Sequence, residues 1–269
     1  NFNSIKYLRE DVQKTYPNYW RSYNCIGQEH LSTANKAKQN GNTQKANEYY
    51  LKAVDQLTLA GEKDKWCPPP PFMLRGAIHI DHLKDYEKAI ADFKKVISFP
   101  NKKDPTQLDG RHNLGLAYFR AGKLNEALQI LDEAIQLNPQ HPKPYYLKGL
   151  IFSKANKHKD ALSNYSKAIQ INPNHIKAYL NRGVIYTDKT NEPNKGLTDF
   201  KHVLQLAPNN QDAIINSAIC YYKMNQTKKA INIYNNILQQ QPKNGRVYYL
   251  RALAFGNQKN FDQAIKDAQ

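Results

Sequence analysis

The residue types that do chemistry are scarce in this sequence, and one short segment brings metal-ligand types together. His79 and His82 lie three residues apart, with Asp81 and Asp85 beside them. If the segment is helical, side chains three or four positions apart share a face, and imidazole and carboxylate groups can then ligate a metal ion. The polar surface of a helix accounts for the same residues. We adopt that second interpretation and expect no metal site.

The sequence contains no other pattern of a catalytic site. It has neither a phosphate-cradling loop of the G-x-x-x-x-G-K type nor an H-E-x-x-H motif. Cys25, Cys67 and Cys220 are too far apart for zinc spacing or a disulfide framework, which favours a reducing compartment. Cys67 has only Lys65 nearby to activate it. We expect no catalytic residue, no cofactor and no small-molecule ligand, and therefore no enzyme.

The charge balance is strongly basic. The 269 residues include 39 Lys and Arg against 23 Asp and Glu, a net charge of +16. The excess is steeper after residue 150, where 17 basic residues face 7 acidic ones. Such a charge favours acidic partners, whether nucleic acid, anionic lipid or acidic protein tails. No apolar stretch reaches the roughly 18 residues of a membrane span, so we expect none.

A repeat of 34 or 35 residues organises the C-terminal part of the chain. In each copy a small residue, an aromatic three positions later, a second small residue, a second large residue and a proline recur in phase. Residues 142–175 show the pattern with Gly149, Phe152, Ala161, Tyr165 and Pro173. Further copies cover residues 108–141, 176–210 and 211–244, a truncated one starts at Gly245, and weaker ones cover 27–60 and 69–101.

This spacing resembles the tetratricopeptide repeat (TPR) family, whose unit is 34 residues. The resemblance implies an all-α fold, a right-handed superhelix (α-solenoid) of stacked antiparallel helix pairs. One pair cannot bury its own apolar face, so the pairs must stabilise one another. Most of the 18 tyrosines then belong to packing positions, which makes stacking on nucleic-acid bases a less favoured alternative than protein binding.

We divide the chain by repeat quality. Residues 1–61 form N-terminal helices with a divergent TPR-like pair, and residues 62–71 a proline-rich connector. Residues 72–107 hold a second divergent pair plus an insertion, and residues 108–269 hold four TPR units and a truncated fifth. Pro68–Pro71 predict an extended connector, because proline fixes φ and lacks a backbone donor. The sequence ends within a helical pattern at Gln269, so we expect a segment of a longer chain.

In TPR proteins the first helix of each pair lines the concave face of the superhelix, so the resemblance implies a partner-binding surface there. Asn113, Asn181 and Asn216 are at equivalent positions, where some relatives grip extended peptides with asparagine. The alternative is that the apolar members pack against the next repeat. The predicted concave-face residues are Asn113, Phe119, Arg120, Lys143, Tyr146, Lys154, Lys177, Asn181, Asn216, Tyr222, Lys223, Arg246 and Tyr249.

A second candidate surface follows the turn inside each helix pair. Stacking brings these turns to one edge, and an ordinary solvated edge is the alternative interpretation. The predicted basic edge consists of Lys123, Lys157, Lys159, Lys195, Lys228, Lys229 and Lys259.

The sequence favours a non-catalytic protein–protein interaction scaffold, a subunit or adaptor in a larger assembly with a negatively charged neighbour. One alternative is a peptide-binding receptor or co-chaperone that uses the concave groove. Another is the regulatory arm of an enzyme whose catalytic domain lies outside this segment. The expected partners are proteins with an acidic surface or tail. We expect an intracellular location in the cytoplasm, with ciliary, cytoskeletal and mitochondrial sites left open.

Overall fold

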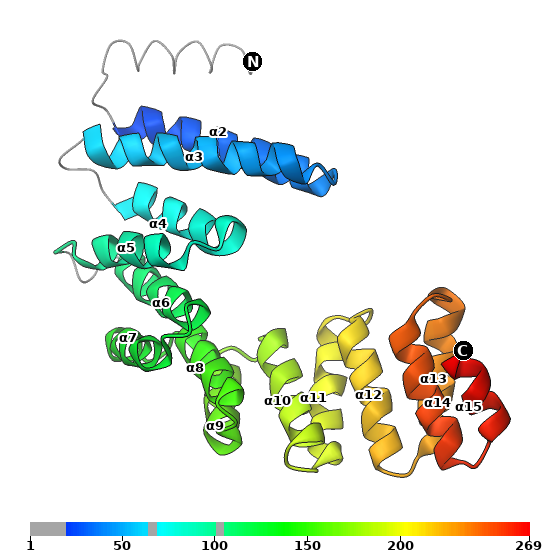
Figure 1. Cartoon of the computed structure of the whole chain (residues 1–269). Coiled ribbons are helices and arrows are strands. Elements are labelled where there is room, and N and C mark those ends of the chain that lie inside the picture. The colour runs from blue at the N-terminus through cyan, green and yellow to red at the C-terminus, as the bar shows by residue number, and fades with distance from the viewer. Residues whose placement is uncertain (1–19, 64–68, 101–104) are drawn as a thin grey trace. The chain divides into compact units, whose positions relative to one another are not determined.

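The computed structural model of the chain describes residues 20–63, 69–100 and 105–269, and every regular element in them is a helix (Figure 1). Contacts divide the chain into two compact units. Unit 1 is Asn1–Pro139 and unit 2 is Gln140–Gln269.

The described part of unit 1 contains three helix pairs. The first is α2 (Trp20–Gln39) with α3 (Thr43–Lys63). The second is α4 (Pro69–Ile78), which continues into a π-helical turn, η1 (His79–Leu83), and packs with α5 (Tyr86–Ile97). The third is α6 (Pro105–Arg120) with α7 (Leu124–Leu137). Each helix packs on the next one along the chain, as a stack of hairpins requires.

Unit 2 contains four pairs, and helices α10 to α15 stand side by side in Figure 1. The pairs are α8 (Pro142–Lys154) with α9 (His158–Ile171), α10 (Ile176–Asp188) with α11 (Pro193–Leu206), α12 (Gln211–Lys223) with α13 (Thr227–Gln240), and α14 (Gly245–Asn257) with α15 (Phe261–Ala268). Each helix again packs on its neighbour in sequence. The predicted fold class, an all-α solenoid of stacked antiparallel helix pairs, is confirmed.

One backbone feature marks every pair in the described residues. Each intrapair turn contains one residue with φ between 55° and 80°, namely Gly41, Lys84, Gly122, Asn156, Asn191, Asn225 and Lys259. In the α8–α9 turn the Lys157 N–H bonds the Phe152 carbonyl at 2.9 Å and the Asn156 N–H bonds the Ser153 carbonyl at 3.1 Å. These bonds satisfy the last carbonyls of the first helix. A residue with positive φ also occurs in the α2–α3 and α4–α5 turns, and the two weak upstream copies are helix pairs as well.

Small residues on the first helix let the second helix approach closely. A Cβ added to Gly149 would lie 2.5 Å from the Tyr165 ring, and one added to Gly183 would lie 2.7 Å from the Phe200 ring. Both rings are fully buried. Because a methyl group cannot fit in that space, the small residue of the repeat sets the distance between the helices of a pair.

The proline-rich connector is shorter than the sequence predicts. Helix α3 runs to Lys63 and α4 begins at Pro69, so Pro69, Pro70 and Pro71 form a first helical turn. Proline suits that position, because the first turn needs no N–H donor and φ is already helical. The extended conformation predicted for these three residues is therefore wrong. Trp66, Cys67 and Pro68 lie outside the described residues.

The predicted insertion before residue 108 is also partly helical, since α6 begins at Pro105. Gln107 is buried, and its side-chain amide donates to the carbonyls of Val96 at 3.0 Å and Phe99 at 3.1 Å. These bonds reach the Val96 carbonyl in the last turn of α5 and the Phe99 carbonyl just after the helix ends at Ile97. The residue therefore joins two successive pairs instead of forming part of a loop.

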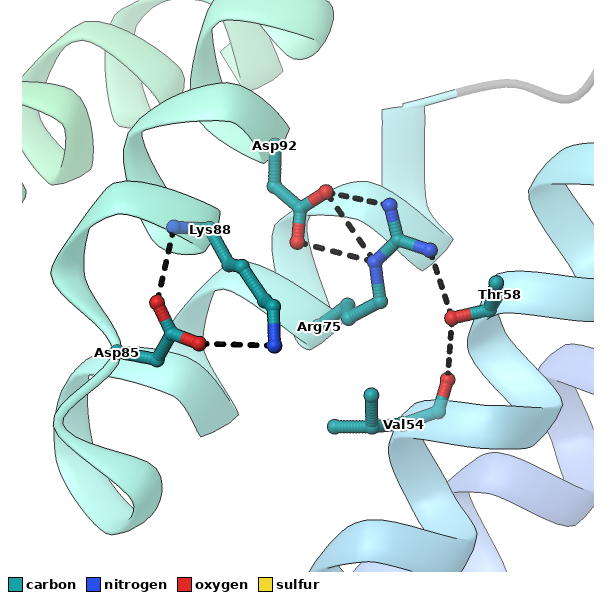
Figure 2. Close-up of polar contacts among 6 residues, drawn as sticks. All are labelled: Val54, Thr58, Arg75, Asp85, Lys88 and Asp92. Atoms are coloured by element: carbon teal, nitrogen blue, oxygen red, sulfur yellow. Dashed lines mark hydrogen bonds and ion pairs between the residues drawn. The ribbon is translucent and has the colours of Figure 1, made fainter.

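A buried Arg–Asp pair recurs in three of the helix pairs. In each, a first-helix arginine bonds both carboxylate oxygens of an aspartate of the second helix and a polar side chain of the preceding pair, as Figure 2 shows for Arg75, Asp92 and Thr58. Arg182 bonds Asp199 at 2.7 and 2.9 Å and Ser166 at 2.9 Å. The third set is Arg251, Asp267 and Asn235. We call each such set a three-helix clamp, because it ties three successive helices together.

The clamp predicts that removing one of its two charges destabilises unit 2 much more than removing both. The side chain of Asp199 is only 4% exposed, so Arg182→Ala leaves a buried carboxylate without its cation. We expect the free energy of unfolding of unit 2 to fall by about 3–5 kcal/mol in urea denaturation. The double variant Arg182→Met/Asp199→Leu should lose far less, because no unpaired charge remains. Equal losses in the two variants would show that packing, and not charge, explains the effect.

Candidate partner-binding surface

The first helices of unit 2 form a common face. Helix α10 contacts α12, and α12 contacts α14, while Asn181 of α10 bonds Tyr146 of α8. We call the predicted site residues on these four helices, taken together as one candidate surface, the first-helix face. Its members are Lys143, Tyr146, Lys154, Lys177, Asn181, Asn216, Tyr222, Lys223, Arg246 and Tyr249. The other predicted residues of that set, Asn113, Phe119 and Arg120, lie on α6 of unit 1.

Asn181 is part of a polar network. Its side-chain Nδ2 donates to the Tyr146 hydroxyl at 3.2 Å. Tyr165 is fully buried on α9, and its ring centroid lies 5.9 Å from that of Tyr146. Burial raises the pKa of both tyrosines, so both hydroxyls keep their protons at neutral pH. The Tyr146 hydroxyl accepts from Asn181, and its own proton can be donated to a partner.

His175 adds a second donor beside Tyr146. It caps α10, and its Nδ1 accepts the Ala178 N–H at 3.3 Å, which leaves Nε2 to carry the proton. Its ring centroid lies 4.8 Å from that of Tyr146. Burial lowers the pKa of His175, helped by the charge of Lys177, so the ring is neutral. Neutral donors and the exposed Lys177 ammonium therefore gather at the start of α10.

Acidic residues are rare on the first helices of unit 2. Residues 142–154 and 245–257 contain none, residues 176–188 contain only Asp188, and residues 211–223 only Asp212. The same four helices carry eight Lys and Arg residues. Asp188 is in addition engaged by Lys223. The face is therefore rich in hydrogen-bond donors and positive charge, which suits carboxylate groups.

Lys223 has a structural role that sequence reasoning missed. Its Nζ donates to the Thr187 carbonyl and to the Asp188 carboxylate, both at 2.9 Å. Thr187 lies in the last turn of α10, whose terminal carbonyls have no intrahelical partner. The lysine thus caps the first helix of the preceding pair by bonding a carbonyl 36 residues away in the sequence. Only the three-dimensional structure brings these groups together.

The basic edge is less uniform than its lysines suggest. Lys157, Lys159, Lys228 and Lys259 are exposed at the intrapair turns of unit 2, but four of that unit's seven acidic residues lie at the same turns. Lys195 pairs with Glu192, and Lys229 donates to the Gln226 side chain at 2.8 Å. Lys123, in unit 1, pairs with Glu87 at 2.7 Å. The edge is positive yet partly neutralised, and its role in binding stays a prediction.

The hollows on the described surface are open to solvent. One of about 560 Å³ lies in unit 2 beside the α12–α13 turn, lined by Asn225, Lys228 and Asn257 among others. No group of three potential metal ligands occurs in the described residues, and His79 and His82 both lie on η1. None of the described helices combines the length and hydrophobicity of a membrane span.

Family models match most of the repeat region. A tetratricopeptide repeat model matches residues 189–254, and a second TPR repeat model matches residues 149–189. The model of anaphase-promoting complex (cyclosome) subunit 3 matches residues 82–168. The chain is a member of the tetratricopeptide repeat family.

Solved structures show the same fold at low sequence identity. A tetratricopeptide repeat protein from Parabacteroides merdae is 20% identical, with a TM-score of 0.63 over 74% of this chain and 77% of that one. Yeast Tom70 is 16% identical, with a TM-score of 0.61 over 99% of this chain and 53% of that one. MamA (AMB-1) is 21% identical, with a TM-score of 0.50 over 61% and 94%. No curated protein sequence matches the chain.

The cap made by Lys223 predicts a stability effect in the absence of any partner. Lys223→Met keeps the aliphatic stem but removes both hydrogen bonds, so we expect a loss of about 0.5–1.5 kcal/mol in the free energy of unfolding. Lys228→Met, at an exposed turn, is the matched control and should change it by less than about 0.5 kcal/mol. Equal stability of the two variants would contradict the structural role of Lys223.

Proposed function

We propose that the chain is a non-catalytic protein-interaction scaffold, and that the first-helix face of unit 2 holds an acidic segment of a partner protein. Membership of the tetratricopeptide repeat family supports the general role. The observation that carries the specific proposal is the charge of the four first helices, on which eight basic residues occur with only two acidic ones, Asp212 and the already paired Asp188.

Internal ion pairs account for only part of this basic excess. On the first helices, Arg182 and Arg251 are held by buried aspartates and Lys223 by Asp188. Lys177 and Arg246 are exposed, each in the first turn of its helix. Those turns contain no acidic residue, although the helix dipole favours negative charge there. A bound carboxylate would supply the missing negative charge at both positions.

Hydrogen-bonding groups beside these cations suit an extended segment. Asn181 and Asn216 are half-buried on α10 and α12, and a side-chain amide can both donate to and accept from a peptide backbone. Tyr146 adds a donor on α8. An extended acidic stretch would then be held by its backbone at the asparagines and by its carboxylates at Lys177 and Arg246.

The alternative of a receptor for short peptides uses the same face and differs in what it holds. Tyr249, which is 63% exposed, and Leu253, which is 43% exposed, offer apolar contact next to Arg246. A peptide receptor would take most of its binding energy from such apolar anchors. The scaffold proposal instead assigns the larger share of the binding energy to charge. The two hypotheses therefore predict a different dependence of binding on salt concentration.

The experiment is fluorescence anisotropy with a labelled twelve-residue Asp- and Glu-rich peptide and its Asn and Gln counterpart. The acidic peptide should bind and the neutral one should bind at least tenfold more weakly at low salt. Lys177→Glu/Arg246→Glu should weaken binding of the acidic peptide by at least tenfold, and the loss should shrink as salt screens the charges.

The control Lys167→Glu/Lys201→Glu makes the same change in net charge on the second helices α9 and α11. It should change the affinity by less than about threefold, because rim charges away from a contact act only over long range. Equal losses in the two double variants would mean that overall charge, and not this face, attracts the peptide. Tight, salt-independent binding of the neutral peptide would favour the receptor.

A further inference from the structure

The α4–α5 pair of unit 1 has an ionisable ring at a packing position that is aromatic in five other pairs. The residue three positions after the small residue of the first helix is aromatic in five pairs, as Tyr118, Phe152, Tyr186, Tyr221 and Phe255. In the α4–α5 pair the small residue is Gly76, and the position holds His79. An ionisable ring therefore replaces an apolar one at a site where the fold calls for burial.

His79 is buried without a complete set of partners. It is 3% exposed, and its Nδ1 has no hydrogen-bond partner. It borders a hollow of about 310 Å³ in unit 1, together with Arg75, Lys88 and Asp92. Buried polar atoms without a partner are uncommon in folded proteins and call for an explanation.

A second histidine lies in the same turn. The His82 ring stacks on Tyr50 of α3 with centroids 3.8 Å apart and planes 9° from parallel, and its Nδ1 also lacks a partner. Both histidines belong to η1, a π-helical turn that ends at Lys84 with φ of 56°. Such turns recur at functional sites, because the extra residue breaks the regular helix.

The charges around both rings come from every helix packed against them. His79 faces Arg75 on α4, Lys88 and Asp92 on α5, and Asp85 in the turn, and it faces the uncharged Val54 and Thr58 of α3. His82 faces Lys38 of α2, Tyr50 of α3 and its neighbour Asp81. Arg75 and Asp92 form the three-helix clamp drawn in Figure 2, so a proton on His79 would add a cation next to that clamp.

We propose that the junction of α3, α4 and α5 is a pH-sensitive joint, which is closed while His79 and His82 are neutral and loosens when they take up protons. The proton on His79 would compete with Arg75 for Asp92. The proton on His82 would place a charge in the buried stack against Tyr50. Either change weakens the contacts that tie the second pair to the first.

The direction of the effect follows from where the protons bind. Burial lowers the pKa of His79 and of His82 below the ordinary value of 6.5. The unfolded chain therefore takes up these protons before the folded chain does as pH falls. The stability of the joint is fully present above about pH 6.5 and is lost as the pH drops from there toward the folded pKa values. Per pH unit, each histidine changes the equilibrium constant for opening of the joint by at most about tenfold.

The test is hydrogen exchange of the full chain at pH 7.5 and pH 5.5, with amide protection corrected for intrinsic rates. Protection in α4, η1 and α5 should fall at least fivefold at the lower pH. Helices α12 and α13 contain no histidine and serve as the internal reference, which should change by less than twofold. Equal protection of the α4–α5 segment at the two pH values would overturn the proposal.

Variants of the histidines test whether the pH effect on protection comes from the His79 and His82 rings. His79→Phe restores the residue type of the other pairs, and His82→Phe keeps a ring on Tyr50, so the double variant should abolish the pH dependence. His30→Phe, in the neighbouring α2, should retain it. A double variant that kept the full pH dependence would contradict the proposal.

A direct titration keeps the proposal testable if the double variant does not fold. The imidazole resonances of the folded wild-type protein, followed by NMR, should give pKa values below 6.5 for both His79 and His82. A value at or above 6.5 for both would overturn the proposal.

Discussion

The contact on which the rest of the structure depends is the close approach of the two helices within a pair and of each pair to the next. A residue as small as Gly183 faces a ring as large as Phe200, and the space between them would not admit a methyl group. Apolar residues left over by one pair are covered by its neighbour: Leu197 and Ile231 are 9% and 8% exposed, whereas Ile265 at the same position of the last described pair is 57% exposed. Stability is therefore shared along each stack instead of residing in one core.

Polar side chains also join successive helices of the stack, in addition to apolar packing. The Arg–Asp clamps each join three successive helices, and Gln107 joins α5 to α6 by its side chain. Although burial lowers the pKa of Arg182, the hydrogen bonds and charge of Asp199 outweigh this and raise it, so the pair stays ionised. Internal ion pairs of this kind engage many of the acidic side chains of unit 2. The exposed cations Lys177 and Arg246 have no such acidic partner in their own helical turns, and the proposed function assigns them to an acidic segment of another protein.

The repeat pattern was enough to predict the helix pairs and the fold, because glycine, alanine, aromatic and proline residues each have one local reason to occur at a fixed position. The clamps escaped prediction because Arg182 and Asp199 are 17 residues apart and neither position is polar in every repeat. The sequence alone places Lys223 on the partner surface. Its bond to the Thr187 carbonyl could not be predicted, because it depends on how two helix pairs stack. From sequence alone the prolines from Pro69 onward predict an extended connector, although a first helical turn suits proline equally well. The sequence does not predict that Asn181 donates to the Tyr146 hydroxyl, because the two residues lie on different helix pairs, and the binding role of the candidate surface stays a prediction.

The most direct test of this account is native-state hydrogen exchange of the whole chain across low urea concentrations. If the pairs of unit 2 stabilise one another, the free energy of opening should be highest in α10 to α13, which have a helix pair on either side, and lowest in α14 and α15. Fraying from the last described pair inward would then precede global unfolding. Equal opening free energies in all eight helices of unit 2, lost together at one urea concentration, would contradict the claim that stability is shared between neighbours.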